Sequence, residues 1–169
     1  MTAVGQVKRA VAAAIKAAGC AAIESYSEEQ LKRYATAVAA VGTKETVIEE
    51  SGAAQYLGEK VDEATQETVS VYGRKMLLTL LIEVYAPRTL GAAGCEKAAE
   101  VVTQTLVTAL PEGLKLGSLQ WGKTGWDKTT GMFRLDASAK YAAYFVAEAA
   151  EDETVFTDFV LKGTVKERE

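Results

Sequence analysis

One segment of the sequence satisfies the phosphate-binding pattern G-x-x-x-x-G-K-[ST] at every position. It spans Gly117 to Thr124. In this pattern backbone N–H groups surround the phosphates of a nucleotide, the lysine reaches the β- and γ-phosphates, and the hydroxyl holds Mg²⁺. The arrangement requires a strand before the loop and a helix that begins at the lysine, because the helix N-terminus favours the anion. The match therefore makes a nucleotide-binding enzyme one hypothesis for this chain.

The residues after this segment argue against a nucleotide site. Gly125 to Gly131 reads GWDKTTG, which is rich in turn formers, and the chain then alternates between apolar and polar residues. Strict alternation is typical of a strand, so we expect no helix at Lys123. The sequence favours a glycine-rich β-hairpin, and the nucleotide-binding enzyme stays as the alternative.

The composition limits other reactive chemistry. The 169 residues contain no histidine, which excludes Ser–His and Cys–His catalytic pairs and His-ligated zinc or iron. The two cysteines, Cys20 and Cys95, are too few for a disulfide framework or a thiolate metal cage. The composition therefore closes off these chemistries, and we expect no metal site.

Charge, hydropathy and length set further bounds. Nineteen basic and 23 acidic residues give a net charge of −4, which provides no general attraction to nucleic acid. No apolar run reaches the roughly 18 residues that a membrane helix needs, and we expect a cytoplasmic protein. The length fits one domain, residues 1–169.

The first third of the chain predicts a helix and a strand. Apolar residues recur at spacings of three and four over residues 3–18, and Gly19 follows them; this pattern indicates an amphipathic helix with a glycine stop. A short extended piece at 21–26 comes next, and Ser27 has the spacing of a capping box for a brief helix. Residues 36–49 are rich in β-branched side chains, which favours a strand.

The rest of the chain predicts a second helix among long strands. Residues 50–67 show no clear period and are expected to form a long loop, whereas residues 68–85 alternate like a strand. A helix is expected over 91–110, with a buried stripe that begins at Cys95. Residues 114–122 and 131–147 are expected to pair as a hairpin.

The order of these elements predicts an α+β fold. An acidic turn at 148–153 is expected to lead to a last strand that carries Val155, Phe159, Leu161 and Val165. Strands joined by turns form an antiparallel sheet, and the apolar stripes of the two helices need one face of that sheet. We therefore expect a mostly antiparallel sheet with two helices packed on one face.

Several phrases of the sequence resemble tail terminator proteins of tailed phages and phage-tail-like contractile particles, particularly those of Gram-positive hosts. Besides the N-terminal helix and the hairpin from Trp121 to Phe133, the phrases are Tyr56-Leu57-Gly58, the strand end from Ile82 to Pro87, and the helix start from Gly91 to Cys95. The resemblance covers most of the chain and implies the terminator-like version of the α+β fold.

The resemblance also implies a structural role, with no catalytic residues, no metal ligands, no cofactor and no enzymatic activity. Such proteins assemble as a hexameric ring on the last ring of tail-tube subunits, end tube polymerisation, and join the tail to the neck, head or cap. The implied partners are other copies of the chain and the tail-tube protein, with sheath and neck proteins as further possibilities, and neither nucleic acid nor membrane. The implied location is the bacterial host cytoplasm during assembly and then the virion or particle. A related head–tail completion or neck protein is the alternative.

Two surfaces are candidates for contacts in such a ring, which needs head-to-tail interfaces between identical subunits. The expected loop at 50–67 contains isolated apolar residues. We hypothesise that this loop becomes ordered when it contacts a neighbouring subunit or the tube. The polar face of the strand at 131–147, which also includes Ser138, is expected to be exposed in the monomer. The candidate interface residues are Gln55, Tyr56, Leu57, Arg134, Asp136 and Lys140.

Overall fold

The computed structural model describes residues 3–50, 56–110 and 113–148. In chain order the elements are α1 (Ala3–Ala17), β1 (Ala21–Ile23), α2 (Glu28–Leu31), β2 (Val38–Glu49), β3 (Tyr56–Val61), β4 (Thr68–Ala86), α3 (Gly91–Thr108), β5 (Lys115–Trp121), β6 (Gly125–Asp127) and β7 (Met132–Glu148). The expected last strand and most of the acidic turn before it lie outside the described residues.

The described strands form one seven-stranded sheet in the order β1-β2-β4-β7-β5, with β3 beside β4 and β6 beside β7. Only the β1–β2 pair is parallel. The β4–β7 ladder is the longest, running from Val71 opposite Glu148 to Ala86 opposite Phe133. The expected α+β class with a mostly antiparallel sheet is confirmed.

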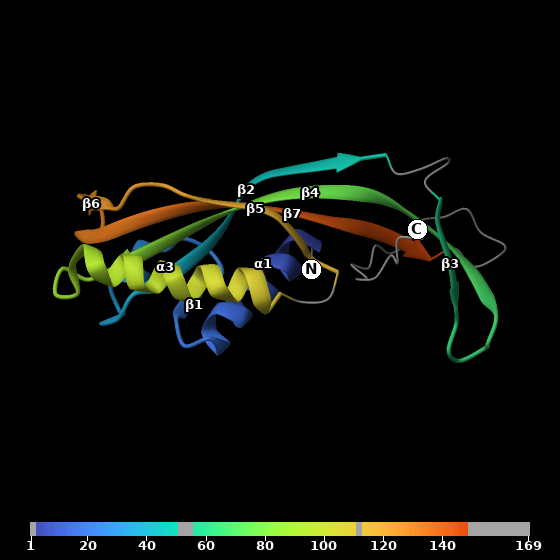
Figure 1. The fold of residues 1–169 in the computed structure, drawn as a ribbon, viewed down its shortest axis with the longest axis horizontal. Helices are drawn as coiled ribbons and strands as arrows, with labels where there is room; N and C mark the ends of the chain where they lie inside the picture. The colour runs from blue at the N-terminus through green and yellow to red at the C-terminus, as the bar shows by residue number, and fades with distance from the viewer. Residues whose placement is uncertain (1–2, 51–55, 111–112, 149–169) are drawn as a thin grey trace.

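Helices α1 and α3 lie along the same side of one half of the sheet (Figure 1). Their buried stripes are Val7, Val11 and Ile15 in α1 and Cys95, Ala98, Ala99, Val102 and Leu106 in α3. These side chains pack on the alternate residues of β4 from Met76 to Val84, and each fully buried aliphatic side chain contributes about 1.5–3 kcal/mol. The two-helix face that the sequence predicts is therefore the main core.

Two glycines set the ends of these helices. Gly19 has φ +93° directly after α1, where a left-handed residue ends the helix at little cost. Gly94 lies in the first turn of α3, and a Cβ there would stand 2.7 Å from the Leu90 Cβ. The same Cβ would stand 3.4 Å from the Ala86 Cβ, so a larger residue at position 94 would crowd both Leu90 and the end of β4.

A second, smaller core occupies the other face near β1. Tyr85 alternates with Val84 and Ala86 along β4, so its side chain points away from α1 and α3. It packs with Leu31 of α2 and Met132 of β7; the remaining members of the cluster are Ile23, Val38 and Ala40. Ser27 caps α2 as the sequence predicts, because its side chain accepts a hydrogen bond from the Gln30 N–H.

The prediction of a loop over residues 50–67 is wrong for its central part. Residues 56–61 form β3, which pairs antiparallel with Thr68–Tyr72 of β4. The register shifts between Tyr56 and Gly58, where Gly58 has φ +133°. Such a bulge interrupts the period-two pattern by which a strand is recognised, so the sequence shows no clear period here.

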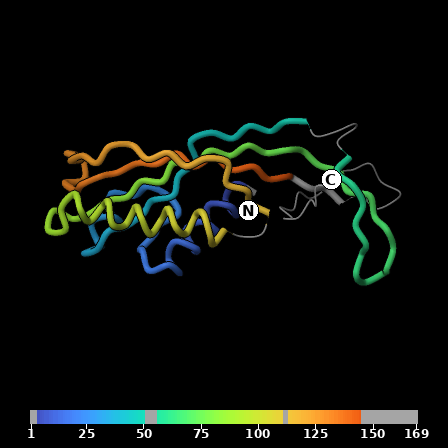
Figure 2. The backbone as a smooth tube through the Cα atoms, viewed as in Figure 1, coloured from blue at the N-terminus to red at the C-terminus, as the bar shows by residue number. Residues whose placement is uncertain are grey.

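A tight turn closes the β3–β4 hairpin. The Asp62 carboxylate accepts hydrogen bonds from the Ala64 N–H at 2.8 Å and the Thr65 N–H at 3.3 Å. Gln66 adopts φ +60°, and its N–H donates to the Asp62 carbonyl at 2.8 Å. The closed hairpin extends beyond the helix-covered half of the molecule (Figure 2).

The expected pairing of 114–122 with 131–147 is confirmed by β5 and β7. The turn-rich stretch between them contains β6, which pairs with the start of β7. Asp127 organises the turn that follows: its carboxylate accepts from the Thr130 hydroxyl at 2.7 Å and from the Thr129 N–H at 3.1 Å. The Thr130 hydrogen bond lowers the pKa of Asp127.

The main core holds one polar atom whose removal should stabilise the fold. Among the described residues, the buried Tyr141 hydroxyl has no hydrogen-bond partner. We expect Tyr141→Phe to raise the free energy of unfolding by about 1 kcal/mol, because an unsatisfied buried hydroxyl carries an uncompensated desolvation cost. Chemical denaturation with a fluorescence readout measures the change.

Tyr85→Phe is the matched control. The Tyr85 hydroxyl is also buried but donates to the Glu83 Oε1 at 3.3 Å, so its loss should lower the free energy of unfolding by about 1 kcal/mol. Equal destabilisation by both variants would contradict the assignment of Tyr141 as unsatisfied.

Candidate functional site

The segment that matches the phosphate-binding pattern does not form a phosphate-binding loop. Gly117 lies inside β5, and β6 begins at Gly125, so a strand rather than a helix follows Lys123. The Gly122 N–H donates to the Asp136 carbonyl of β7 at 2.7 Å, so this N–H is already used in a hydrogen bond to the sheet. Thr124 faces an acidic side chain, with its hydroxyl 3.5 Å from the Glu96 Oε1. The geometry expected from the alternation after Gly131 is confirmed.

The two cysteines lie in protein interior rather than in a reactive setting. Cys20 and Cys95 are both free and buried. Burial raises the pKa of the Cys20 thiol and raises that of Cys95 to about 11, so both thiols stay protonated at neutral pH. The Cys95 thiol donates to the Phe133 carbonyl at 3.2 Å. Cys95 therefore serves as a packing residue between α3 and the sheet.

The described residues contain no group of three or more histidine, cysteine or acidic side chains placed to hold a metal ion. None of the helices in the described part of the chain has the length and apolar character to cross a bilayer.

Three charged residues form a cluster on the sheet face opposite α1 and α3. Arg134 of β7 contacts Glu83 of β4, with 2.7 Å between its Nη2 and the Glu83 Oε1. The same guanidinium binds Asp136 with two hydrogen bonds, of 2.7 Å and 2.8 Å. Two carboxylates thus share one guanidinium, and the cluster retains a net negative charge.

Burial dominates the electrostatics of this cluster. It raises the pKa of Glu83, and the adjacent Arg134 acts in the opposite direction without cancelling the rise. Tyr85 donates to the same carboxylate. The sequence places Glu83 and Arg134 on the polar sides of their strands, but only the β4–β7 register brings them together.

The expectation that this polar face is exposed is met only in part, because Arg134, Asp136 and Ser138 are half-buried. The side chains of Arg134 and Asp136 are 37% and 39% exposed and form the cluster with Glu83. Ser138 is half-buried and accepts a hydrogen bond from the Lys44 Nζ at 3.3 Å. Lys140 is exposed as expected. The ion pairs across neighbouring strands cover the guanidinium and explain the difference.

The candidate residues at the other end of the molecule lie on β3. Tyr56 is 43% exposed, and its ring meets Tyr72 edge-on at 5.7 Å. Leu57 is half-buried, and Gln55 lies outside the described residues. Tyr72 and Tyr85, which mark the levels of the two candidate surfaces, are about 40 Å apart along β4 at roughly 3.3 Å per residue. The predicted interface residues therefore belong to two separate surfaces.

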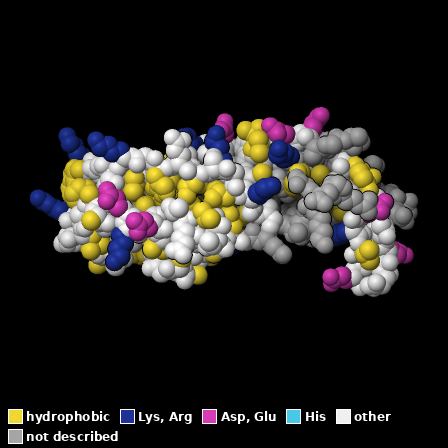
Figure 3. Space-filling model, in the orientation of Figure 1, with side chains coloured by type: hydrophobic (Ala, Val, Ile, Leu, Met, Phe, Trp, Pro, Cys, Tyr) yellow, Lys and Arg dark blue, Asp and Glu magenta, His cyan; other side chains and the backbone are white. Residues whose placement is uncertain are grey.

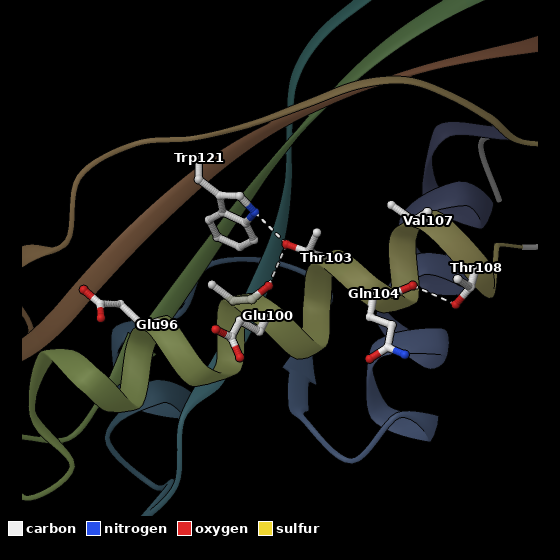
Figure 4. Close-up of a pocket in the computed structure, with 8 residues that line it drawn as sticks. Glu96, Glu100, Thr103, Gln104, Val107, Thr108 and Trp121 are labelled. Atoms are coloured by element: carbon white, nitrogen blue, oxygen red, sulfur yellow. Dashed lines mark hydrogen bonds between the residues drawn. The ribbon is translucent and has the colours of Figure 1, made fainter.

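A shallow groove of about 460 Å³ runs along α3 beside Trp121. The Trp121 indole N–H donates to the Thr103 hydroxyl at 2.8 Å, which in turn donates to the Ala99 carbonyl (Figure 4). Glu96, Glu100 and Val107 line the rest of the groove. The hydrogen bonds fix the indole against the helix, and the groove has a mostly apolar surface that includes Trp121, Ala99 and Val107.

Exposed large apolar side chains occur in both halves of the molecule. Val47 and Ile48 lie near the end of β2, opposite Leu77 and Met76, and Tyr56 and Val61 lie on β3. The others in the described chain are Tyr26, Leu90, Val107 and Trp126. The face of the molecule in Figure 3 also shows acidic side chains on the hairpin. The uncovered half of the sheet thus combines apolar contact area with charge.

The two sequence comparisons identify no relative of this chain. No protein-family model matches the chain, and no curated protein is similar enough in sequence to count as a match.

The buried carboxylate makes stability depend on pH in a defined direction. Because the pKa of Glu83 is raised in the folded state, its contribution favours the fold at low pH and is lost as the pH rises above the ordinary value of 4.5. We expect the unfolding free energy of the wild type, relative to that of Glu83→Gln, to decrease as the pH rises from about 4 to 7. Denaturant titrations at several pH values measure this difference.

Thr79→Val is the control, since Thr79 is buried on the same face of β4 and carries no ionisable group. Its difference from the wild type should be independent of pH. A pH-independent difference for Glu83→Gln would show that burial does not control the pKa of Glu83.

Proposed function

We propose that this protein is a non-enzymatic assembly protein that caps a tail tube as a hexameric ring, in the manner of the tail terminators that its sequence resembles. It ends tube polymerisation and joins the tail to the neck, head or cap. Its partners are its own copies and the tail-tube protein, with sheath and neck proteins further out. It acts in the bacterial cytoplasm during assembly and then in the virion or tail-like particle.

The observation that carries the proposal is the half of the sheet that no helix covers. From the level of Met76 the sheet continues through the end of β2, through β4 and through β7 to the β3–β4 hairpin. Exposed apolar side chains here are Val47 and Ile48, opposite Leu77 and Met76 at the border of the helix-covered half, and Val61 on the hairpin. A monomer that leaves such side chains on an extended sheet has surface suited to a partner. The same part of the chain holds no cluster of reactive side chains among its described residues.

The placement of this surface fits a capping role. The main core and both long helices occupy one half of the molecule, and the hairpin extends from the other half (Figure 2). The rigid half provides the body of a ring subunit, and the extension can reach a neighbour or the end of the tube. Tyr56 and Leu57, proposed from the sequence, lie on this extension.

Val61→Lys tests the role of the hairpin. Val61 is 57% exposed, so we expect the substitution to leave the melting temperature within about 2 °C of the wild type, as for most surface changes. We expect tube capping to weaken at least tenfold, which corresponds to about 1.4 kcal/mol of lost contact energy. Electron microscopy of purified tube subunits polymerised with each protein measures tube length and the fraction of capped ends.

Val107→Lys is the matched control, because Val107 is an equally apolar side chain, 65% exposed, on the outer surface of α3. It should cap like the wild type. Normal capping by Val61→Lys would exclude the hairpin from the contact. Wild-type protein that binds only heads or necks, and leaves tube length unchanged, would favour the head–tail completion alternative.

A further inference from the structure

The described sheet has two open edges, one on each side. On one side β1 covers β2 only from Val38 to Ala40, so beyond Ala40 the outer edge of β2 meets no described strand. On the other side β5 pairs with β7 alone among the described strands. Unpaired edges display backbone N–H and C=O groups that can pair with another chain.

The two edges lie at the same level along the sheet. A level here means a line of residues that pair with one another across successive strands. The ladders β2–β4, β4–β7 and β7–β5 connect the two edges in this way. Two levels are Val47, Leu77, Ala142 and Lys115 on the first, and Gly42, Leu81, Ser138 and Gln120 on the second. A copy placed side by side with another therefore brings its β2 edge to the β5 edge without a shift along the strands.

The strand directions also match. β2 and β7 both run antiparallel to β4, and β5 runs antiparallel to β7. β5 therefore runs opposite to β2, and two copies in the same orientation would form an antiparallel pair between these edges. This is the arrangement of nearly all the ladders within the subunit.

The charges of the two edges are complementary at this alignment. On the face opposite the helices, Lys115 falls opposite Val47, and the exposed Glu45 and Glu49 are its diagonal neighbours. Lys44 is turned inward toward Ser138. A two-fold contact of β2 with β2 would instead bring the glutamates of both copies together, which is destabilising.

The apolar residues match on the other face. Ile48 and Thr46 of β2 share the helix-bearing face with Met76 and Leu78, their partners on β4. At the shared level Leu116 of β5 falls opposite Thr46 and diagonal to Ile48. The exposed Ile48 side chain therefore gains an apolar neighbour when the edges pair.

We propose that β5 of one copy pairs with β2 of the next copy, so that a single sheet continues from subunit to subunit around the ring. This inference rests on the ring of the proposed function and names its subunit contact. A head-to-tail contact gives a closed ring when the rotation between neighbours closes and an open filament when it does not. Edges at equal levels give no shift along the strands, which is what a ring of side-by-side subunits requires.

Disulfide cross-linking tests the contact in the full-length protein. In Val47→Cys/Lys115→Cys the two thiols face each other across the proposed edge pair, whereas within one subunit they are about 14 Å apart across three strand spacings, too far for a disulfide. We expect oxidation in the presence of purified tube subunits to give a ladder of covalent oligomers that ends at the subunit number of the ring. The native cysteines are buried and should not contribute.

Two controls make the result specific. Lys97→Cys/Lys115→Cys, with the first cysteine on the exposed surface of α3, should give no ladder. Val47→Cys alone should remain uncross-linked, and a covalent dimer from it would overturn the proposal in favour of a two-fold β2 contact. A cross-link to the tube subunit, or no cross-link at all, would also overturn it.

Charge exchange provides a second measurement. Lys115→Glu in the otherwise wild-type protein should weaken ring assembly on tube ends, because it places like charges beside Glu45 and Glu49. Glu45→Lys/Glu49→Lys added to Lys115→Glu should restore assembly. Capped tubes without the Val47–Lys115 ladder would leave the capping function intact and refute only the edge pairing. A ladder without capping would support the edge pairing and refute the function.

Discussion

The long antiparallel ladder between β4 and β7 is the constraint on which the rest of the structure depends. On β4 it runs from Val71 to Ala86. The strands β2 and β5 pair with β4 and β7, so its register fixes their positions along the sheet. One face of its helix-covered half is apolar from Met76 to Val84 and holds α1 and α3. The opposite face brings Glu83 to Arg134 and leaves both partly buried. Register on this ladder therefore decides both the core and the charged cluster.

The same ladder is longer than the helices that cover it. Its far part carries β3 on one side of β4. The outer edges of β5 and of β2 beyond Ala40 meet no described strand, and they lie at matching levels. Each of these edges contains one register shift, between Thr43 and Glu45 and between Leu116 and Ser118. Bulges bend and twist a strand, which suits a sheet that must curve around a ring. Surface left open by the fold is thus the physical basis of the proposed assembly.

The sequence predicts those elements whose side chains repeat regularly. Val7, Val11 and Ile15 repeat at helical spacing, and Leu135, Ala137 and Ala139 repeat at strand spacing, so α1 and β7 are found in the expected places. β3 could not be predicted because the bulge before Gly58 interrupts its alternation. The charged cluster could not be predicted either, since alternation assigns each residue to a face but does not fix which residues of two strands lie opposite. Only the register pairs Glu83 with Asp136 and sets Arg134 beside both.

The most direct test of the account is amide hydrogen exchange of the free protein and of the same protein bound to tail tubes. Assembly should slow exchange in β2 beyond Ala40, in β5 and in the β3–β4 hairpin, because these segments lie at the edges of the described sheet in the subunit and would be buried in the proposed ring. Amides of α1 and α3 should change little, since the main core already protects them. Slowed exchange confined to the helices, with the sheet edges and hairpin unchanged, would contradict the claim that the uncovered half of the sheet is the assembly surface.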